Sequence, residues 1–200
     1  MENQYLEEKE PSQYESVGSF ILEIVKIFIL AFVIIAPVRM FLFQPFFVQG
    51  ASMEPNFENN EYLIINEISY RFSGPQRGDI IIFRYPKDPS QYFIKRVIGL
   101  PGETVKIKDN KVYIKNGEHP DFVELDESEY LASTVGTFNY GRAEYVLEAD
   151  QYFVMGDNRE QSLDSRRFGS VPKRLIIGNA WVRGWPFDKV TIFKTPTYNF

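Results

Sequence analysis

The chain has 200 residues, a net charge of −5, and ordinary shares of hydrophobic (44%) and charged (24%) residues. This length is typical of one domain or two small ones, and the acidic balance argues against nucleic-acid binding. The sequence contains no cysteine and a single histidine, His119, which excludes thiol nucleophiles, disulfides, Cys-ligated metals and a two-histidine metal site. Any catalysis therefore uses Ser, Thr, Lys, Tyr, Asp or Glu, and we expect no cofactor and no metal.

The N-terminal part combines an acidic tail with a long apolar segment. Residues 1–18 carry five glutamates against one lysine and are predicted to form a polar tail. Residues 19–39 supply the roughly 20 mostly apolar residues that cross a bilayer, with only Glu23 and Lys26 charged before Arg39. A cleaved signal peptide would begin with a basic region, so we predict an uncleaved transmembrane anchor, with a buried soluble helix as the alternative. Basic residues lie on both sides of the segment, and charge therefore does not fix its orientation.

The segment after the anchor, Met40–Val48, stays strongly apolar. Pro37 and Pro45 argue against one continuous helix through this region, because proline removes a helical hydrogen bond. We interpret the segment as chain that leaves the membrane and stays against its surface.

The remaining domain, residues 40–200, is predicted to be mainly β, because short runs of β-branched and aromatic residues alternate with turn signals. A more polar excursion at about residues 106–145 is predicted to be an inserted subdomain or hairpin. Its His119 lies between Asn116-Gly117 and Pro120, which predicts an exposed loop. The predicted strands are Tyr62–Asn66, Asp79–Tyr85, Tyr92–Leu100, Thr104–Lys108, Lys111–Lys115, Tyr152–Met155, Ala180–Gly184 and Val190–Lys194.

The first segment with chemical potential is the loop Gln49–Asn56, which contains Ser52. Gly50 and Ala51 leave room beside Ser52 for a substrate backbone to approach. Serine is also a common turn residue, so this loop alone does not identify a nucleophile.

The second segment, Tyr92–Gly102, carries adjacent cations at Lys95 and Arg96. On a strand, alternate residues share a face, so Lys95 lies with Phe93 and Val97 while Arg96 lies on the opposite face. A lysine held among apolar neighbours loses solvation, which lowers its pKa and makes it a base for a hydroxyl. The alternative is an edge strand from which both cations reach solvent.

The third segment, Met155–Gly169, concentrates turn formers, carboxylates and guanidiniums. It predicts either a functional site or a salt-bridged loop in which Asp157 or Asp164 pairs with Arg159 or Arg166. It does not fit a calcium loop, because Arg159 occupies a position that needs an oxygen ligand.

The order of these segments is more specific than any one of them. A Ser-Met-x-Pro loop at Ser52 follows an anchor, then comes Lys-Arg-Val-x-Gly-x-Pro-Gly from Lys95, then Gly-Asp-Asn-Arg-x-x-Ser-x-Asp-Ser-Arg from Gly156. Together with Gly78–Phe83, this arrangement closely resembles bacterial type I signal peptidase, and the similarity runs from the anchor to about Gly184.

The resemblance implies a membrane-bound Ser/Lys endopeptidase that removes signal peptides from exported preproteins. It implies that Ser52 is the nucleophile, that Lys95 is its general base and that Ser162 orients the lysine. Asp164 and Arg166 would form the supporting ion pair. The fold implied is a single transmembrane helix followed by a mainly β catalytic domain with a variable β insert.

The resemblance also implies the partners and the topology: signal-peptide-bearing preproteins, a phospholipid bilayer, a cytoplasmic N-terminus and an extracytoplasmic catalytic domain. One departure concerns the oxyanion. Some family members have a Ser or Thr two residues before the nucleophile, whereas this chain has Gly50, so the donor must be a main-chain N–H or be absent. Phe47, Val48 and Met53 are candidates to line the substrate pocket.

Two other functions stay open. A self-cleaving Ser/Lys repressor has a related β core, but such proteins carry DNA-binding segments and lack this anchor. A catalytically silent, membrane-anchored secretion or assembly factor is the second alternative, because sequence does not show that Ser52 and Lys95 meet in space.

Overall fold

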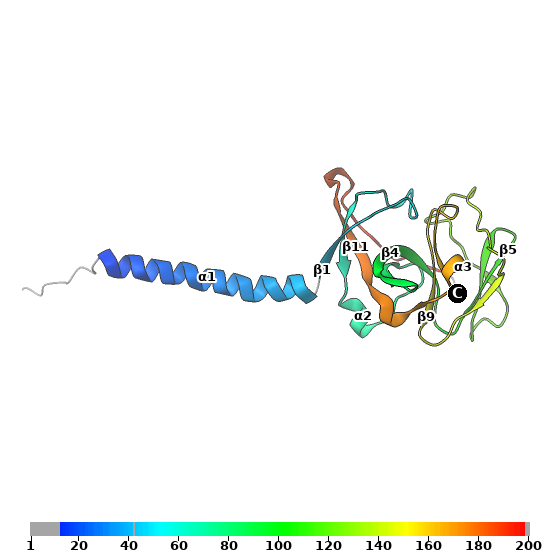
Figure 1. Cartoon of the computed structure of the whole chain (residues 1–200), viewed down its shortest axis with the longest axis horizontal. Helices are drawn as coiled ribbons and strands as arrows, with labels where there is room; N and C mark the ends of the chain where they lie inside the picture. Colours follow the sequence, from blue (N-terminus) through cyan, green and yellow to red (C-terminus); the bar gives the residue numbers. More distant parts are fainter. Residues whose placement is uncertain (1–12, 42, 199–200) are drawn as a thin grey trace, which may run out of the picture. The chain divides into compact units, whose positions relative to one another are not determined.

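The computed structural model describes residues 13–41 and 43–198, and the chain divides between Met40 and Phe41 into two units (Figure 1). Most of the predicted polar tail, residues 1–12, lies outside the described residues. The first unit is the helix α1 (Gln13–Phe41), which begins ahead of the predicted anchor start at residue 19. Pro37 lies inside this helix rather than ending it, at the cost of one hydrogen bond close to the helix C-terminus.

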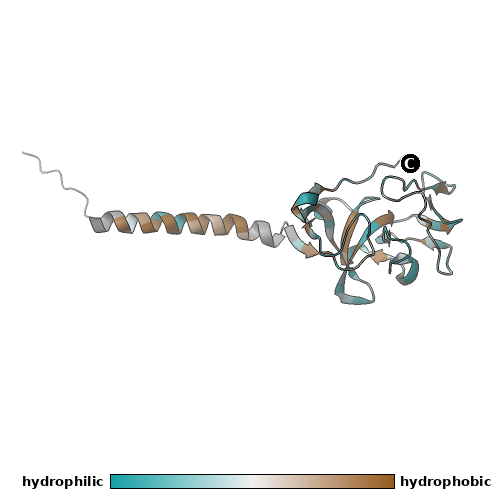
Figure 2. Cartoon of the chain, turned by 90° about the horizontal axis from the view of Figure 1, so that it is seen from above, coloured by the Kyte–Doolittle hydropathy of each residue, from teal (hydrophilic) through white to brown (hydrophobic). Residues whose placement is uncertain are grey.

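Helix α1 has the length and composition of a membrane span. Its stretch Val17–Ala36 has a mean hydropathy of 2.6, and none of it is buried. Figure 2 shows apolar residues along most of this helix. This length and apolar composition favour the anchor over the buried-helix alternative.

The second unit is mainly β, as predicted, and is built on an antiparallel sheet with the strand order β1-β2-β11-β3-β4-β9-β10, with β12 paired to β11. The apolar segment after the anchor contributes β1, which pairs with β2, so part of it belongs to this sheet. The strands are β1 (Phe43–Phe47), β2 (Tyr62–Asn66), β3 (Ile80–Tyr85), β4 (Asp88–Gly99), β9 (Gln151–Met155), β10 (Val171–Pro172), β11 (Ile176–Trp185) and β12 (Thr191–Ile192).

A second antiparallel sheet, in the order β7-β6-β5-β8, forms the inserted excursion. Its strands are β5 (Thr104–Lys108), β6 (Lys111–Lys115), β7 (Val123–Glu124) and β8 (Glu144–Val146). Asp109 and Asn110 join β5 to β6 with φ values of 49° and 62°, the left-handed backbone that a two-residue hairpin requires. His119 lies in a loop as predicted, but it is half-buried rather than exposed.

Helices in the second unit are all short among the residues described: α2 (Ser69–Phe72), α3 (Ser165–Phe168) and the 3₁₀ turns η1 (Lys173–Leu175) and η2 (Phe187–Lys189). The main sheet is therefore covered largely by other β-structure and by loops.

Both faces of the main sheet are buried where β3 and β4 meet. Ile80 and Ile82 of β3 belong to one apolar cluster, and Ile81 and Phe83 belong to another. The register pairs Ile81 with Lys95 and Ile80 with Arg96. Because paired residues of antiparallel strands share a face, the two cations of β4 enter opposite sides of the sheet, and both sides are covered.

Candidate active site

Ser52 lies in a tight turn between β1 and β2 that is anchored by its own apolar residues. Met53 and Phe57 are each only 1% exposed, and the Phe57 N–H donates to the Met53 carbonyl at 2.9 Å. Gly50 has a φ of +90°, which favours glycine, and its N–H donates to Asn59 Oδ1 at 3.0 Å. Burial of its flanking side chains therefore fixes the turn, while Ser52 itself stays half-exposed.

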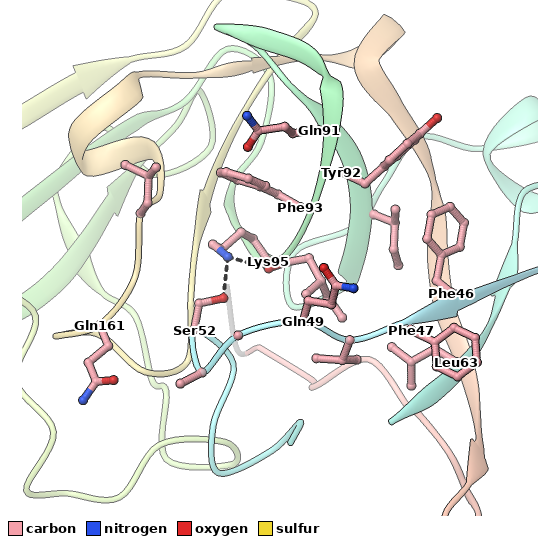
Figure 3. A pocket seen from close by; sticks show the side chains of 16 residues that line it. Phe46, Phe47, Gln49, Ser52, Leu63, Gln91, Tyr92, Phe93, Lys95 and Gln161 are labelled. Atoms are coloured by element: carbon pink, nitrogen blue, oxygen red, sulfur yellow. Dashed lines mark hydrogen bonds between the residues drawn. The ribbon is translucent and has the colours of Figure 1, made fainter. Parts of the chain in front are cut away.

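Lys95 reaches Ser52 from strand β4, which is separated from β2 in the sheet by β11 and β3. Its Nζ donates to Ser52 Oγ at 2.6 Å and to the Ile94 carbonyl at 2.7 Å (Figure 3). Strand β4 lies between β3 and β9, and Lys95 and Arg96 are each 4% exposed. The alternative in which both cations reach solvent from an edge strand is therefore wrong.

Burial changes the protonation of this amine. Desolvation lowers the pKa of Lys95 from 10.5 to about 8, against the opposing fields of Asp164 and Asp157. The Phe93 ring centroid lies 5.4 Å from Nζ, on the face that the strand pattern predicts. About a tenth of Lys95 is therefore neutral at pH 7 and about half at pH 8, and the neutral amine is able to accept the Ser52 proton.

The Ser52 and Lys95 side chains open into a cavity of about 560 Å³. Figure 3 shows them at one end, with Phe46, Phe47 and Leu63 at the other. Phe47 and Val48 line this cavity as predicted, but Met53 does not, because it is packed into the core. The walls combine apolar side chains with polar groups in about equal measure, which suits an extended peptide segment whose backbone also needs hydrogen-bond partners. The full lining is Phe46, Phe47, Val48, Gln49, Gly50, Ala51, Ser52, Leu63, Ile82, Gln91, Tyr92, Phe93, Ile94, Lys95, Gln161 and Leu163.

The third segment supplies the buried ion pair Asp164–Arg166. Two hydrogen bonds join them, Arg166 Nε to Asp164 Oδ1 at 2.9 Å and Nη2 to Oδ2 at 2.8 Å, and both side chains are fully buried. Asp164 Oδ2 also accepts the Gly156 N–H at 3.2 Å. The structure thus forms the predicted pairing of Asp164 with Arg166.

Ser162 does not make the hydrogen bond to Lys95 that the resemblance implies. It is 2% exposed, and within the described part of the chain its Oγ has no hydrogen-bond partner. Its neighbour in space is Gly156, where an added Cβ would lie 2.4 Å from Ser162 Oγ and 2.3 Å from the Ser52 carbonyl oxygen. The missing side chain at Gly156 therefore allows the third segment to pack against the Ser52 turn, where the Asn158 N–H donates to the Ser52 carbonyl at 3.1 Å.

Asp157 has a partner that the sequence did not indicate. It binds Arg96 through hydrogen bonds of 2.8 and 2.7 Å, and its Oδ2 also accepts from Asn56 Nδ2 at 2.8 Å. Arg159, the predicted alternative partner of Asp157, instead binds Glu127 at 2.9 Å. The adjacent cation at Arg96 was the available signal, but its carboxylate lies 61 residues away in sequence.

Several known proteins are similar to this chain in sequence over most of its length. The profile of the family described as signal peptidase, peptidase S26, matches residues 21–185. The chain is 38% identical over 174 residues to a probable signal peptidase I-2 of Synechocystis sp., covering 84% of this chain and 75% of that protein. It is 39% identical to a signal peptidase I of Leptolyngbya laminosa (85% and 82% covered) and 36% identical to one of Bacillus licheniformis (92% and 97% covered).

Proposed function

The chain belongs to the signal peptidase family, peptidase S26, as a serine peptidase that removes signal peptides, and we propose that Ser52 is its nucleophile and Lys95 its general base. The observation that carries this assignment is the 2.6 Å contact between Lys95 Nζ and Ser52 Oγ at the end of the cavity. The same membership argues against the self-cleaving repressor alternative.

The proposed reaction begins with the neutral Lys95 amine taking the proton of the Ser52 hydroxyl. Ser52 Oγ attacks the carbonyl carbon of the scissile peptide, and the tetrahedral intermediate collapses to an acyl-enzyme as the leaving amine receives the proton from Lys95. A water molecule, deprotonated by the same amine, then hydrolyses the ester and restores Ser52. Lys95 thus fills the role that histidine has in other serine peptidases.

The oxyanion requires a main-chain donor in this proposal. The Gly50 N–H already donates to Asn59, and glycine has no hydroxyl to replace it. We assign the role to the N–H of Ser52 itself, at the turn that Met53 and Phe57 anchor.

Supporting roles follow for the third segment. The Asp164 carboxylate raises the pKa of Lys95 even with the Arg166 guanidinium bound to it, so the proposed role of this ion pair is to hold the wall of the site in place. Ser162, buried beside Gly156, is the proposed partner of the Lys95 amine after Ser52 has been acylated and no longer bonds to it.

The proposed location is a cell membrane, with a cytoplasmic N-terminus and the catalytic domain outside, resting on the bilayer where anchored preproteins emerge. Support comes from aromatic side chains exposed on the catalytic domain: Phe47 (65%), Trp185 (50%) and Phe187 (77%). We expect a truncation that lacks residues 1–38 to self-associate and to gain activity with detergent or lipid. A monodisperse truncation that is indifferent to both would contradict this location.

The decisive experiment incubates a secretory preprotein with the full-length enzyme in phospholipid vesicles. Wild type should release the signal peptide, whereas Ser52→Ala and Lys95→Ala should process it at least about 10³-fold more slowly. Equal processing by all three would end the dyad assignment. No processing by wild type would favour the catalytically silent alternative.

A further inference from the structure

The sequence of the inserted excursion shows no obvious chemistry. Residues 127–138 of this excursion nevertheless contact the loops that build the candidate active site. This segment is defined here as the rear clamp. The Tyr130 carbonyl accepts from Asn56 Nδ2 at 2.8 Å, and the Tyr130 ring centroid lies 4.0 Å from the Arg96 guanidinium. The Phe138 carbonyl accepts from Arg166 at 3.3 Å. Asn56 follows the nucleophile turn and Arg96 follows Lys95, so the rear clamp touches every segment that builds the site.

Its strongest contact is with Arg159. This side chain is 1% exposed, and its guanidinium donates to both carboxylate oxygens of Glu127 and to Thr137 Oγ1. A guanidinium so deeply buried requires a charged partner, because its desolvation is otherwise uncompensated. Glu127 supplies that charge across 32 residues of sequence.

Arg159 in turn holds the loop that backs the nucleophile. Its Nε donates to the Gly156 carbonyl at 3.2 Å, and its own carbonyl accepts from Arg166 at 2.6 Å. Gly156 packs so closely against the Ser52 carbonyl and Ser162 Oγ that an added Cβ would lie within 2.4 Å of both. Polar contacts therefore run from Glu127 through Arg159 to Gly156, and Gly156 packs against the Ser52 turn.

We infer that Glu127 is a positioning residue of the peptidase, which acts through Arg159 to hold Gly156 against the Ser52 turn. The inference rests on the proposed function. Without the Glu127 carboxylate, the Arg159 guanidinium would move toward water and release the Gly156 carbonyl. Because Ser52 Oγ and Lys95 Nζ belong to different elements, a small shift of the turn lengthens their contact and slows acylation, while the cavity that binds substrate is left in place.

The test measures kcat and KM for preprotein cleavage by full-length enzyme in vesicles, with rates normalised to the folded fraction. Glu127→Ala should lower kcat about 10- to 100-fold with KM changed less than about threefold. Glu127→Gln keeps one carbonyl acceptor and should recover part of that loss. Glu129→Gln is the matched control, because Glu129 is an exposed carboxylate of the same segment, and it should retain wild-type kcat.

A purely structural role for Glu127 would lower the melting temperature and leave kcat of the folded enzyme unchanged. That result in Glu127→Ala would overturn the inference. If Glu127→Ala does not fold, the Glu127→Gln variant tests the inference instead. A kcat of Glu127→Gln equal to that of the control Glu129→Gln would then overturn the inference. Wild type that fails to cleave the preprotein would instead contradict the proposed function, so the two failures are distinguishable.

Discussion

Lys95 and Arg96 are neighbours on β4 and equally buried, yet on the two faces of the sheet their charges have different surroundings. Arg96 meets Asp157 in a hydrogen-bonded ion pair, with Tyr130 against its guanidinium. Lys95 donates only to a hydroxyl and a carbonyl, and its nearest carboxylates act at longer range. Burial lowers the pKa of both side chains, but at Arg96 the hydrogen bonds and charge of Asp157 outweigh it and the pKa is raised.

This difference separates structural charge from chemical reactivity. A paired guanidinium stays protonated and stabilises the packing of three segments. An amine without a bound carboxylate can lose its proton near neutral pH, which general-base catalysis requires. The following predictions test this contrast, in order of decreasing effect.

Removing a charge should lower the stability of the protein on the face of the sheet where Arg96 pairs with Asp157. Asp157→Asn leaves the Arg96 guanidinium buried without its carboxylate, and we expect the free energy of unfolding to fall by about 3–5 kcal/mol. Urea denaturation in detergent measures the change, with the exposed Asp121→Asn as the control. A loss below about 1 kcal/mol would show that Asp157 is not the essential partner of Arg96.

On the opposite face, where Lys95 has no bound carboxylate, removing the charge should instead raise the stability. Lys95→Met removes a buried ammonium and should raise the free energy of unfolding at pH 7 by about 3 kcal/mol. In wild type, the free-energy cost of burying the charged Lys95 ammonium is fully present below pH 8. This cost disappears as pH rises from about 8, the pKa in the folded protein, through the ordinary lysine pKa of 10.5. The gain should therefore vanish above about pH 11. Lys87→Met, at an exposed lysine, should show no such pH dependence.

The pH dependence of kcat/KM should follow the titration of the same Lys95 amine. We expect kcat/KM of wild type to rise with pH and level off, with a midpoint at about 8. Asp164 raises the pKa of Lys95, so Asp164→Asn should move the midpoint to lower pH, whatever its effect on the plateau. A midpoint that stays in place, or moves upward, would contradict the assignment of Lys95 as the titrating base.

The smallest effect is expected at the histidine. His119 lies in a loop of the insert and does not line the catalytic cavity, so His119→Ala should leave kcat/KM within about twofold of wild type. A loss comparable to that of Lys95→Ala, measured on the same preprotein, would transfer the general-base role from lysine to histidine.

Local patterns were enough to find most of the long strands. Tyr62–Asn66, Thr104–Lys108 and Lys111–Lys115 are strands with the predicted bounds. The strands β7, β8 and β10, of two or three residues each, were missed, because so few residues show little of an alternating pattern. Strand β1 was interpreted as chain against the membrane, since an apolar run looks the same at a bilayer and in a sheet.

The active site was predictable only in part. The order of the segments picked out Ser52, Lys95, Ser162, Asp164 and Arg166 through a family resemblance. The Asp164–Arg166 pair was implied in advance, but the partners of Asp157 and Arg159 were not readable, and Glu127 was absent from every candidate set. Its partner Arg159 is 32 residues away, and such pairs are brought together by strand order rather than by local spacing.

The missing cysteines and the single histidine narrowed the possible catalytic groups from composition alone, because side-chain chemistry is a property of each residue. The apolar helix was predicted from the length of an apolar run, and the β-rich domain from short β-branched and aromatic runs between turn signals. Folding decided which of two adjacent cations is paired with a carboxylate and which has a lowered pKa, because desolvation and Coulomb attraction depend on distances in space. Packing placed a carboxylate on Arg96 and none on Lys95, beside the hydroxyl of Ser52.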